Sequence, residues 1–105
     1  MLFIVTLTYV RPADEVNSRF EAHRDWLVAN TRSGRIAVAG PLDAQAGGLI
    51  VAHCSDRAEL DHMLTQDPFV LEKLVTVDVL GAVPGLRHED FPARWAPDAK
   101  AVAGQ

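Results

Sequence analysis

The alternation of apolar and polar residues at the start of the chain predicts a β-strand over residues 2–9. This segment is rich in β-branched and aromatic residues, and one parity of it is apolar throughout: Phe3, Val5, Leu7 and Tyr9. Leu2 and Ile4 begin the opposite parity, ahead of Thr6 and Thr8. Because apolar residues occur on both parities, we expect this strand to be covered on both faces, at least where it begins.

Three later segments also have the composition of strands. Residues 36–42 and 49–54 are joined by the glycine-containing turn 43–48, so together they predict a β-hairpin. A last strand is expected over residues 75–82, where one face carries Val75, Val77 and Val79.

Helical periodicity appears between these strands. Residues 15–33 place apolar side chains at helical intervals, namely Val16, Phe20, Trp26 and Leu27. Pro12 fits a first turn, and Gly34 fits a left-handed C-terminal cap. A second helix is expected from Asp56, because Glu59 three residues later completes a capping box. It should end at Asp67, the residue before a proline, with a short helical turn over residues 70–74.

The predicted order is strand, helix, strand, strand, helix, strand over residues 1–82. This order defines an α+β fold of the ferredoxin-like βαββαβ type, a four-stranded antiparallel sheet with two helices on one face. The other face keeps apolar residues that nothing in the chain covers. A second copy packing sheet to sheet would cover them, so we expect a homodimer that forms a dimeric α/β barrel.

Residues 83–105 read as a C-terminal tail rather than a second domain. The segment contains Pro84, Gly85, Pro92 and Pro97 among scattered charges. Leu86, Phe91 and Trp95 supply enough apolar surface to dock part of it on the body or on a partner. From about Asp98 onward we expect disorder.

Charge and cysteine content narrow the possible partners. Ten Lys and Arg against fourteen Asp and Glu give a net charge of -4, which disfavours nucleic acid and anionic membranes as partners. A single cysteine, Cys54, makes no internal disulfide, and the apolar N-terminus lacks the features of a signal peptide. We therefore expect a cytoplasmic protein.

The spacing of the histidines does not match a metal site. The four are His23, His53, His62 and His88, and none has a metal-ligand spacing such as H-x-x-E-H. The chain also lacks a P-loop, and Gly47-Gly48 alone does not predict a dinucleotide site. We expect no metal and no cofactor.

His23 and Asp67 are the candidates for chemistry. His23 interrupts an apolar stripe, and a residue of this kind is most often a core histidine with one hydrogen bond, so structural and functional interpretations both stay open. Asp67 is equally open, because Asp-Pro is a common helix stop. We expect its carboxylate at a helix C-terminus, the unfavourable end of the dipole, and a position that breaks a local rule is a functional candidate. If the two meet, Asp67 would fix the imidazole tautomer and His23 would act as general base or acid.

Five other residues are candidates for substrate contact. Phe69 and Trp26 could stack on a flat ligand, although aromatic residues at such positions are more often core. Gly40 and Pro41 leave room for a ligand at a strand end. Arg35 could pair with an anionic substrate, although a solvated or dimer-contact arginine is the commoner case.

In their order along the chain, these residues resemble the YciI-like family, also called the YCII-related domain. The resemblance rests on His23, on the segments Ser33-Gly34-Arg35 and Ala39-Gly40-Pro41-Leu42, and on Asp67-Pro68-Phe69. It covers about residues 1–82. It implies a dimeric α/β barrel with a cleft between helices and sheet and a His-Asp active site that carries over onto His23 and Asp67. One branch, a dehydrochlorinase of a chlorinated hydroxyhydroquinone, implies lyase-type proton chemistry on small ring compounds.

Three functional hypotheses follow. The first is cofactor-independent His-Asp acid–base catalysis, of lyase or isomerase type, on a small molecule, with aromatic compounds among the candidates. The second is a non-catalytic module that binds a small ligand or a partner, in which the pair merely ties helix to sheet. The third is a related barrel enzyme, of the monooxygenase or muconolactone-isomerase kind, that uses other residues.

Overall fold

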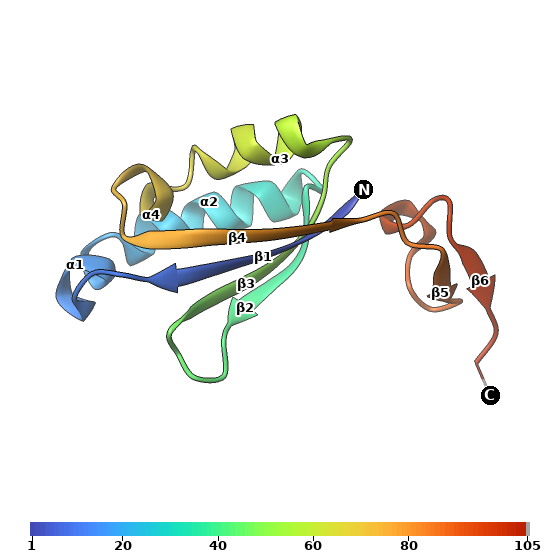
Figure 1. Cartoon of the computed structure of the whole chain (residues 1–105), viewed down its shortest axis with the longest axis horizontal. Coiled ribbons are helices and arrows are strands. Elements are labelled where there is room, and N and C mark those ends of the chain that lie inside the picture. The colour runs from blue at the N-terminus through green and yellow to red at the C-terminus, as the bar shows by residue number, and fades with distance from the viewer. Residues whose placement is uncertain (105) are drawn as a thin grey trace.

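Four antiparallel strands form one sheet in the order β2-β3-β1-β4, and the longer helices cover one face of it (Figure 1). The structure is a computed structural model, and it describes residues 1–104. The elements are β1 (Leu2–Tyr9), α1 (Ala13–Ser18), α2 (Phe20–Arg32), β2 (Ile36–Pro41), β3 (Gly47–His53), α3 (Arg57–Leu64), α4 (Pro68–Leu71), β4 (Val75–Ala82), β5 (Leu86–His88), the 3₁₀ turn η1 (Ala93–Trp95) and β6 (Lys100–Val102). This confirms the expected α+β, ferredoxin-like fold. No helix in the described residues is long and apolar enough to span a membrane.

The core lies between the sheet and the helices. The expected parity of β1 is confirmed, since Phe3, Val5 and Leu7 are buried beneath the helices. They pack with buried residues from every other element of the layer, among them Trp26, Ile36, Ile50, Leu60, Met63 and Phe69. The apolar residues on the helix-facing side of the sheet therefore fix the position of α2 through Trp26.

The opposite face of the sheet carries an apolar row that crosses all four strands. Val38 pairs with Val51, Val51 with Ile4, and Ile4 with Leu80. Within this row Val38 is 60% exposed and Leu80 is 73% exposed. Large apolar side chains aligned in this way on an uncovered face are typical of an interaction surface. We call this row the open-face row.

The first helical segment is broken, where one continuous helix was expected. Arg19 separates α1 from α2, with backbone angles of φ -114° and ψ 6°. The Arg19 N–H donates to the Val16 carbonyl, which closes α1, and the side chain of Arg19 bonds Glu72 beside α4. The break changes the direction of the apolar stripe, so Val16 is buried whereas Phe20, predicted to share that stripe, is 50% exposed.

The tail docks through a short segment and then extends past the end of the sheet (Figure 1). Ala96 is buried, and the Trp95 ring meets His53 edge-on at a centroid distance of 5.9 Å. Where disorder was expected from Asp98, the structure has β6 paired in parallel with β5. Backbone bonds such as Lys100 N–H to the Gly85 carbonyl hold this pair, and three-residue strands leave no periodicity in a sequence.

Position 47 of the hairpin has room for glycine but not for a residue with a Cβ. It begins β3, one position earlier in the chain than Gly48, at φ +157°, and a Cβ built there would lie 1.7 Å from the backbone oxygen of Leu7. At Gly47 strand β3 thus approaches β1 through a backbone contact that leaves no room for a side chain.

We predict that Gly47→Ala lowers the free energy of unfolding by about 1–3 kcal/mol, because the backbone of β1 or β3 must move to admit the methyl group. Gly85→Ala is the matched control, since a Cβ there meets nothing within 4 Å. Urea unfolding followed by circular dichroism measures both. Equal stability of the two variants would contradict the close approach.

Candidate active site

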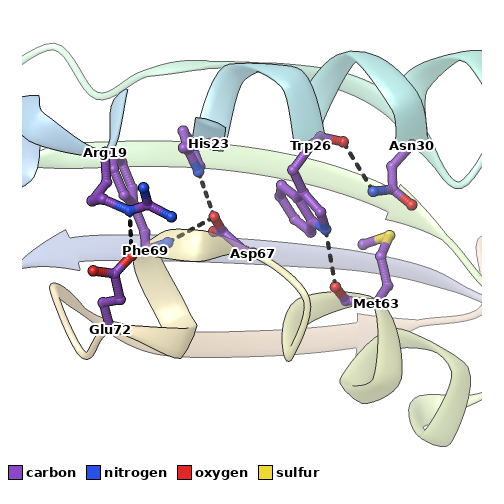
Figure 2. Close-up of polar contacts among 8 residues, drawn as sticks. All are labelled: Arg19, His23, Trp26, Asn30, Met63, Asp67, Phe69 and Glu72. Atoms are coloured by element: carbon purple, nitrogen blue, oxygen red, sulfur yellow. Dashed lines mark hydrogen bonds and ion pairs between the residues drawn. The ribbon is translucent and has the colours of Figure 1, made fainter. Parts of the chain in front are cut away.

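His23 and Asp67 meet beneath α2, although 44 positions separate them in the chain. His23 lies on the inner side of α2, and Asp67 lies in the turn between α3 and α4 (Figure 2). The imidazole Nδ1 is 2.7 Å from the carboxylate Oδ1. His23 is 8% exposed and Asp67 is 0% exposed, so the bond is shielded from water. A short bond to a charged group in such surroundings is among the stronger interactions of a small domain.

Asp67 is the N-cap of α4 and does not end α3. α3 ends at Leu64, and Pro68 takes the first position of α4, where its missing N–H costs nothing. The Asp67 Oδ1 accepts the Phe69 N–H at 3.0 Å. The expectation that Asp67 lies at a helix C-terminus is therefore wrong. Two residues separate it from the end of α3, and its carboxylate meets the favourable N-terminal end of α4 instead. Its second oxygen, Oδ2, is buried without a partner in the described residues.

Two aromatic rings hold the imidazole in its plane. Phe69 stacks on His23 with a centroid distance of 3.9 Å and an interplanar angle of 5°. Trp26 lies 5.9 Å away at 27°, and its indole N–H donates to the Met63 carbonyl at 3.2 Å. Both rings are buried and neither lines the neighbouring cleft. The structure therefore places Phe69 and Trp26 behind the imidazole rather than where they could contact a ligand.

A cleft of about 280 Å³ opens between α2 and the strands β1, β2 and β3. Its lining is Leu7, Tyr9, Phe20, His23, Arg24, Leu27, Ala39, Gly40, Pro41, Gly47, Gly48, Leu49 and Ile50. A carboxylate accepts hydrogen bonds, so a neutral imidazole that bonds Asp67 through Nδ1 would carry its hydrogen there and keep the lone pair on Nε2. No side chain or backbone group of residues 1–104 bonds Nε2, and this atom is not sealed from solvent. His23 therefore lines the cleft and keeps one ring nitrogen without a partner among residues 1–104.

Gly40 and Pro41 line the same cleft as His23, but Arg35 does not. Arg35 is exposed, and its carbonyl accepts the His53 N–H at the other end of the hairpin. Two polar lining residues, Tyr9 and Arg24, were not among the candidates chosen from the sequence. Tyr9 could have been found from its shared parity with Leu7, and Arg24 from its spacing of four residues after Phe20.

The single thiol is not part of this site. Cys54 is buried at the end of β3, and burial together with the nearby Glu59 carboxylate raises the pKa of the thiol to about 11. A thiol with this pKa stays protonated near neutral pH and is a poor nucleophile. Within residues 1–104, no three His, Cys, Asp or Glu side chains gather as a metal-binding group.

The fold and these residues agree with a family assignment. The model of the YCII-related domain matches residues 1–80. The chain therefore belongs to the YCII-related domain family, which confirms the resemblance seen in the sequence. No curated protein matches the chain.

Two solved structures share the fold. One is 5-chloro-2-hydroxyhydroquinone dehydrochlorinase from Burkholderia phenoliruptrix in complex with 2,5-dihydroxybenzoquinone, with 21% identity, a TM-score of 0.66, and 84% of this chain and 95% of that chain covered. The other is muconolactone isomerase, with 21% identity, a TM-score of 0.66, and coverage of 86% of this chain and 93% of that chain. At this level of identity the likeness establishes the fold alone.

We predict that Asp67→Ala lowers the free energy of unfolding by about 2–4 kcal/mol, because the Phe69 N–H and the His23 Nδ1–H both lose their buried acceptor. Asp67→Asn should cost less, since its amide oxygen can still accept. Urea denaturation at neutral pH compares the variants. An alanine variant as stable as the asparagine variant would show that the two hydrogen bonds add nothing to stability.

Proposed function

We propose that the protein is a cofactor-independent acid–base enzyme of lyase or isomerase type that acts on a small ring compound. The observation that carries the proposal is the two-sided environment of His23. Its Nδ1 is held by a buried carboxylate, and the same residue lines an open cleft, with no partner for Nε2 among residues 1–104. An imidazole held in one tautomer beside a substrate cavity is the usual form of a general base.

In this proposal the substrate lies in the cleft with an acidic C–H or O–H against Nε2. His23 takes this proton, and the bonding electron pair moves into the substrate. In an elimination the pair forms a double bond as the leaving group departs with its own electrons. In an isomerisation the imidazolium returns the proton to a neighbouring atom. Asp67 stabilises the imidazolium through Nδ1–H, and the stacked face of Phe69 adds a cation–π attraction.

The size and lining of the cleft support a small, flat substrate. About 280 Å³ is just below the range of pockets that hold drug-sized molecules. Its walls are largely apolar, and Gly47 and Gly48 leave the strand backbone bare on one side. Two proteins of the same fold support the reaction class, a dehydrochlorinase in complex with a dihydroxybenzoquinone and an isomerase of a lactone.

We predict that His23→Gln lowers turnover at least about 100-fold on any substrate found in a panel of halogenated hydroquinones and unsaturated lactones, because proton transfer by a positioned side chain contributes about that much or more. Release of chloride and exchange of substrate hydrogen with deuterated water measure the reaction. His62→Gln is the matched control, since His62 lies on α3 and its imidazole bonds no side chain of residues 1–104 other than the exposed Gln66.

The non-catalytic hypothesis predicts a different result. A module in which His23 only ties α2 to α4 would lose stability in His23→Gln, and the wild-type protein would turn over no compound of the panel. Undiminished turnover by a folded His23→Gln variant would refute the acid–base role directly.

We also propose that the protein is a homodimer joined through the open-face row. Four apolar side chains in register across the sheet support this contact, because their exposure to water is unfavourable by about 25 cal/mol for each Å².

We propose the cytoplasm as the compartment of this protein. The buried, unpaired Cys54 fits this proposal.

We predict that Leu80→Glu shifts the protein from dimer to monomer, because it places a charge within the apolar open-face row. Val28→Glu is the matched control, since Val28 is an exposed apolar residue of α2 on the other side of the sheet. Sedimentation velocity at micromolar concentration measures the assembly. A wild-type monomer, or dissociation by both variants alike, would contradict the sheet-to-sheet interface.

A further inference from the structure

The wall of the cleft that α2 provides contains one permanently charged residue. Phe20, His23, Arg24 and Leu27 have the i, i+3, i+4, i+7 spacing of a single helix face, and all four line the cleft. The other charged residues of α2, which are Glu21, Asp25 and Arg32, do not line it. Arg24 therefore lies between Phe20 and Leu27 on this face and is itself exposed.

The charge balance of the lining is entirely positive. Of the thirteen lining residues none is acidic, and only His23 and Arg24 can carry a positive charge. Arg11, Arg19 and Arg57 each pair with a carboxylate, on Glu15, Glu72 and Asp61 respectively. Within residues 1–104 no such pair involves Arg24. Its guanidinium is thus not paired with any carboxylate of residues 1–104, and the cleft lining holds no acidic residue.

We propose that the cleft takes a ring compound bearing a carboxylate, and that Arg24 is the residue that binds this carboxylate. The inference rests on the proposed function, since it names the substrate class for the His23 site. A guanidinium presents a planar fork of donors that matches a carboxylate in two parallel hydrogen bonds. Because Arg24 is exposed, salt would screen this attraction.

Binding at Arg24 would also orient the substrate. Arg24 and His23 are neighbours on one helix, so a ring whose carboxylate lies at Arg24 has a fixed edge toward Nε2 of His23. The Tyr9 hydroxyl lines the cleft from β1, where it can bond a ring oxygen. A neutral ring would keep the apolar contacts and lose the fixed orientation. In this proposal Arg24, and not Arg35 as the sequence suggested, pairs with the anionic substrate.

The test compares two rings that differ only in the carboxylate, 2,5-dihydroxybenzoate and 1,4-dihydroxybenzene. Isothermal titration calorimetry under nitrogen, at low and at high salt, gives the dissociation constant of each. We expect the wild-type protein to bind the benzoate at least ten times more tightly, with a preference that falls as salt rises. Arg24→Gln should remove this preference and leave the affinity for the neutral ring unchanged, while Arg24→Lys should keep part of it.

Arg32→Gln is the matched control, because Arg32 is an exposed arginine of the same helix that does not line the cleft. Equal binding of the two rings by the wild-type protein, no binding of either at millimolar concentration, or equal effects of Arg24→Gln and Arg32→Gln would each overturn the proposal. The readout needs no turnover, so it is separable from the proposed reaction. A His23→Gln variant that loses activity but keeps the preference for the benzoate would support both proposals, and retained activity would refute only the reaction.

Discussion

The hydrogen bond between His23 and Asp67 joins α2 to the turn before α4, two segments that are far apart in the sequence. α2 contributes the imidazole, and the turn before α4 contributes the carboxylate, so one 2.7 Å contact fixes both helices over the sheet. Asp67 also caps α4 through the Phe69 N–H, and Phe69 in turn stacks on the imidazole. Three residues thereby constrain one another. Loss of any one of them would leave a buried donor, a buried charge or an unsupported ring.

This closed arrangement explains why one nitrogen of His23 is free. The Nδ1 side of the ring meets Asp67, and Phe69 and Trp26 lie against the ring (Figure 2), while His23 also lines the cleft. The structural and functional interpretations of His23 are therefore not exclusive. The same bond that secures α2 also fixes the tautomer that a general base requires. Only the chemistry at Nε2 separates an enzyme from a binding module.

Two surfaces stay uncovered in one copy of the chain. In the open-face row Ile4, Val38 and Leu80 are exposed and Val51 is half-buried, and the pair β5 and β6 extends past the sheet (Figure 1). Parallel strands in proteins are normally covered on both faces. Both features leave apolar surface unburied, which is costly for a chain of this length because a small domain buries a limited fraction of its surface on its own.

The sequence alone determined the architecture. Alternation in residues 2–9 and 75–82, the capping box at Asp56 and the left-handed Gly34 are local signals, and a local signal needs no knowledge of distant residues. His23 could be selected because an imidazole in an apolar stripe is locally unusual. The break at Arg19 could not be predicted from the sequence. It coincides with a contact between Arg19 and Glu72, a residue distant in the chain that follows α4.

Tertiary structure decided which candidates share a site. It brought Asp67 to His23, placed Phe69 and Trp26 behind the imidazole, and left Arg35 outside the cleft. It also made Arg24 a lining residue, which depends on the direction of α2 over the hairpin. Residue type shows what chemistry a side chain can perform. The packing of helices on the sheet determines which side chains face one another, because contacts between distant segments depend on the whole fold.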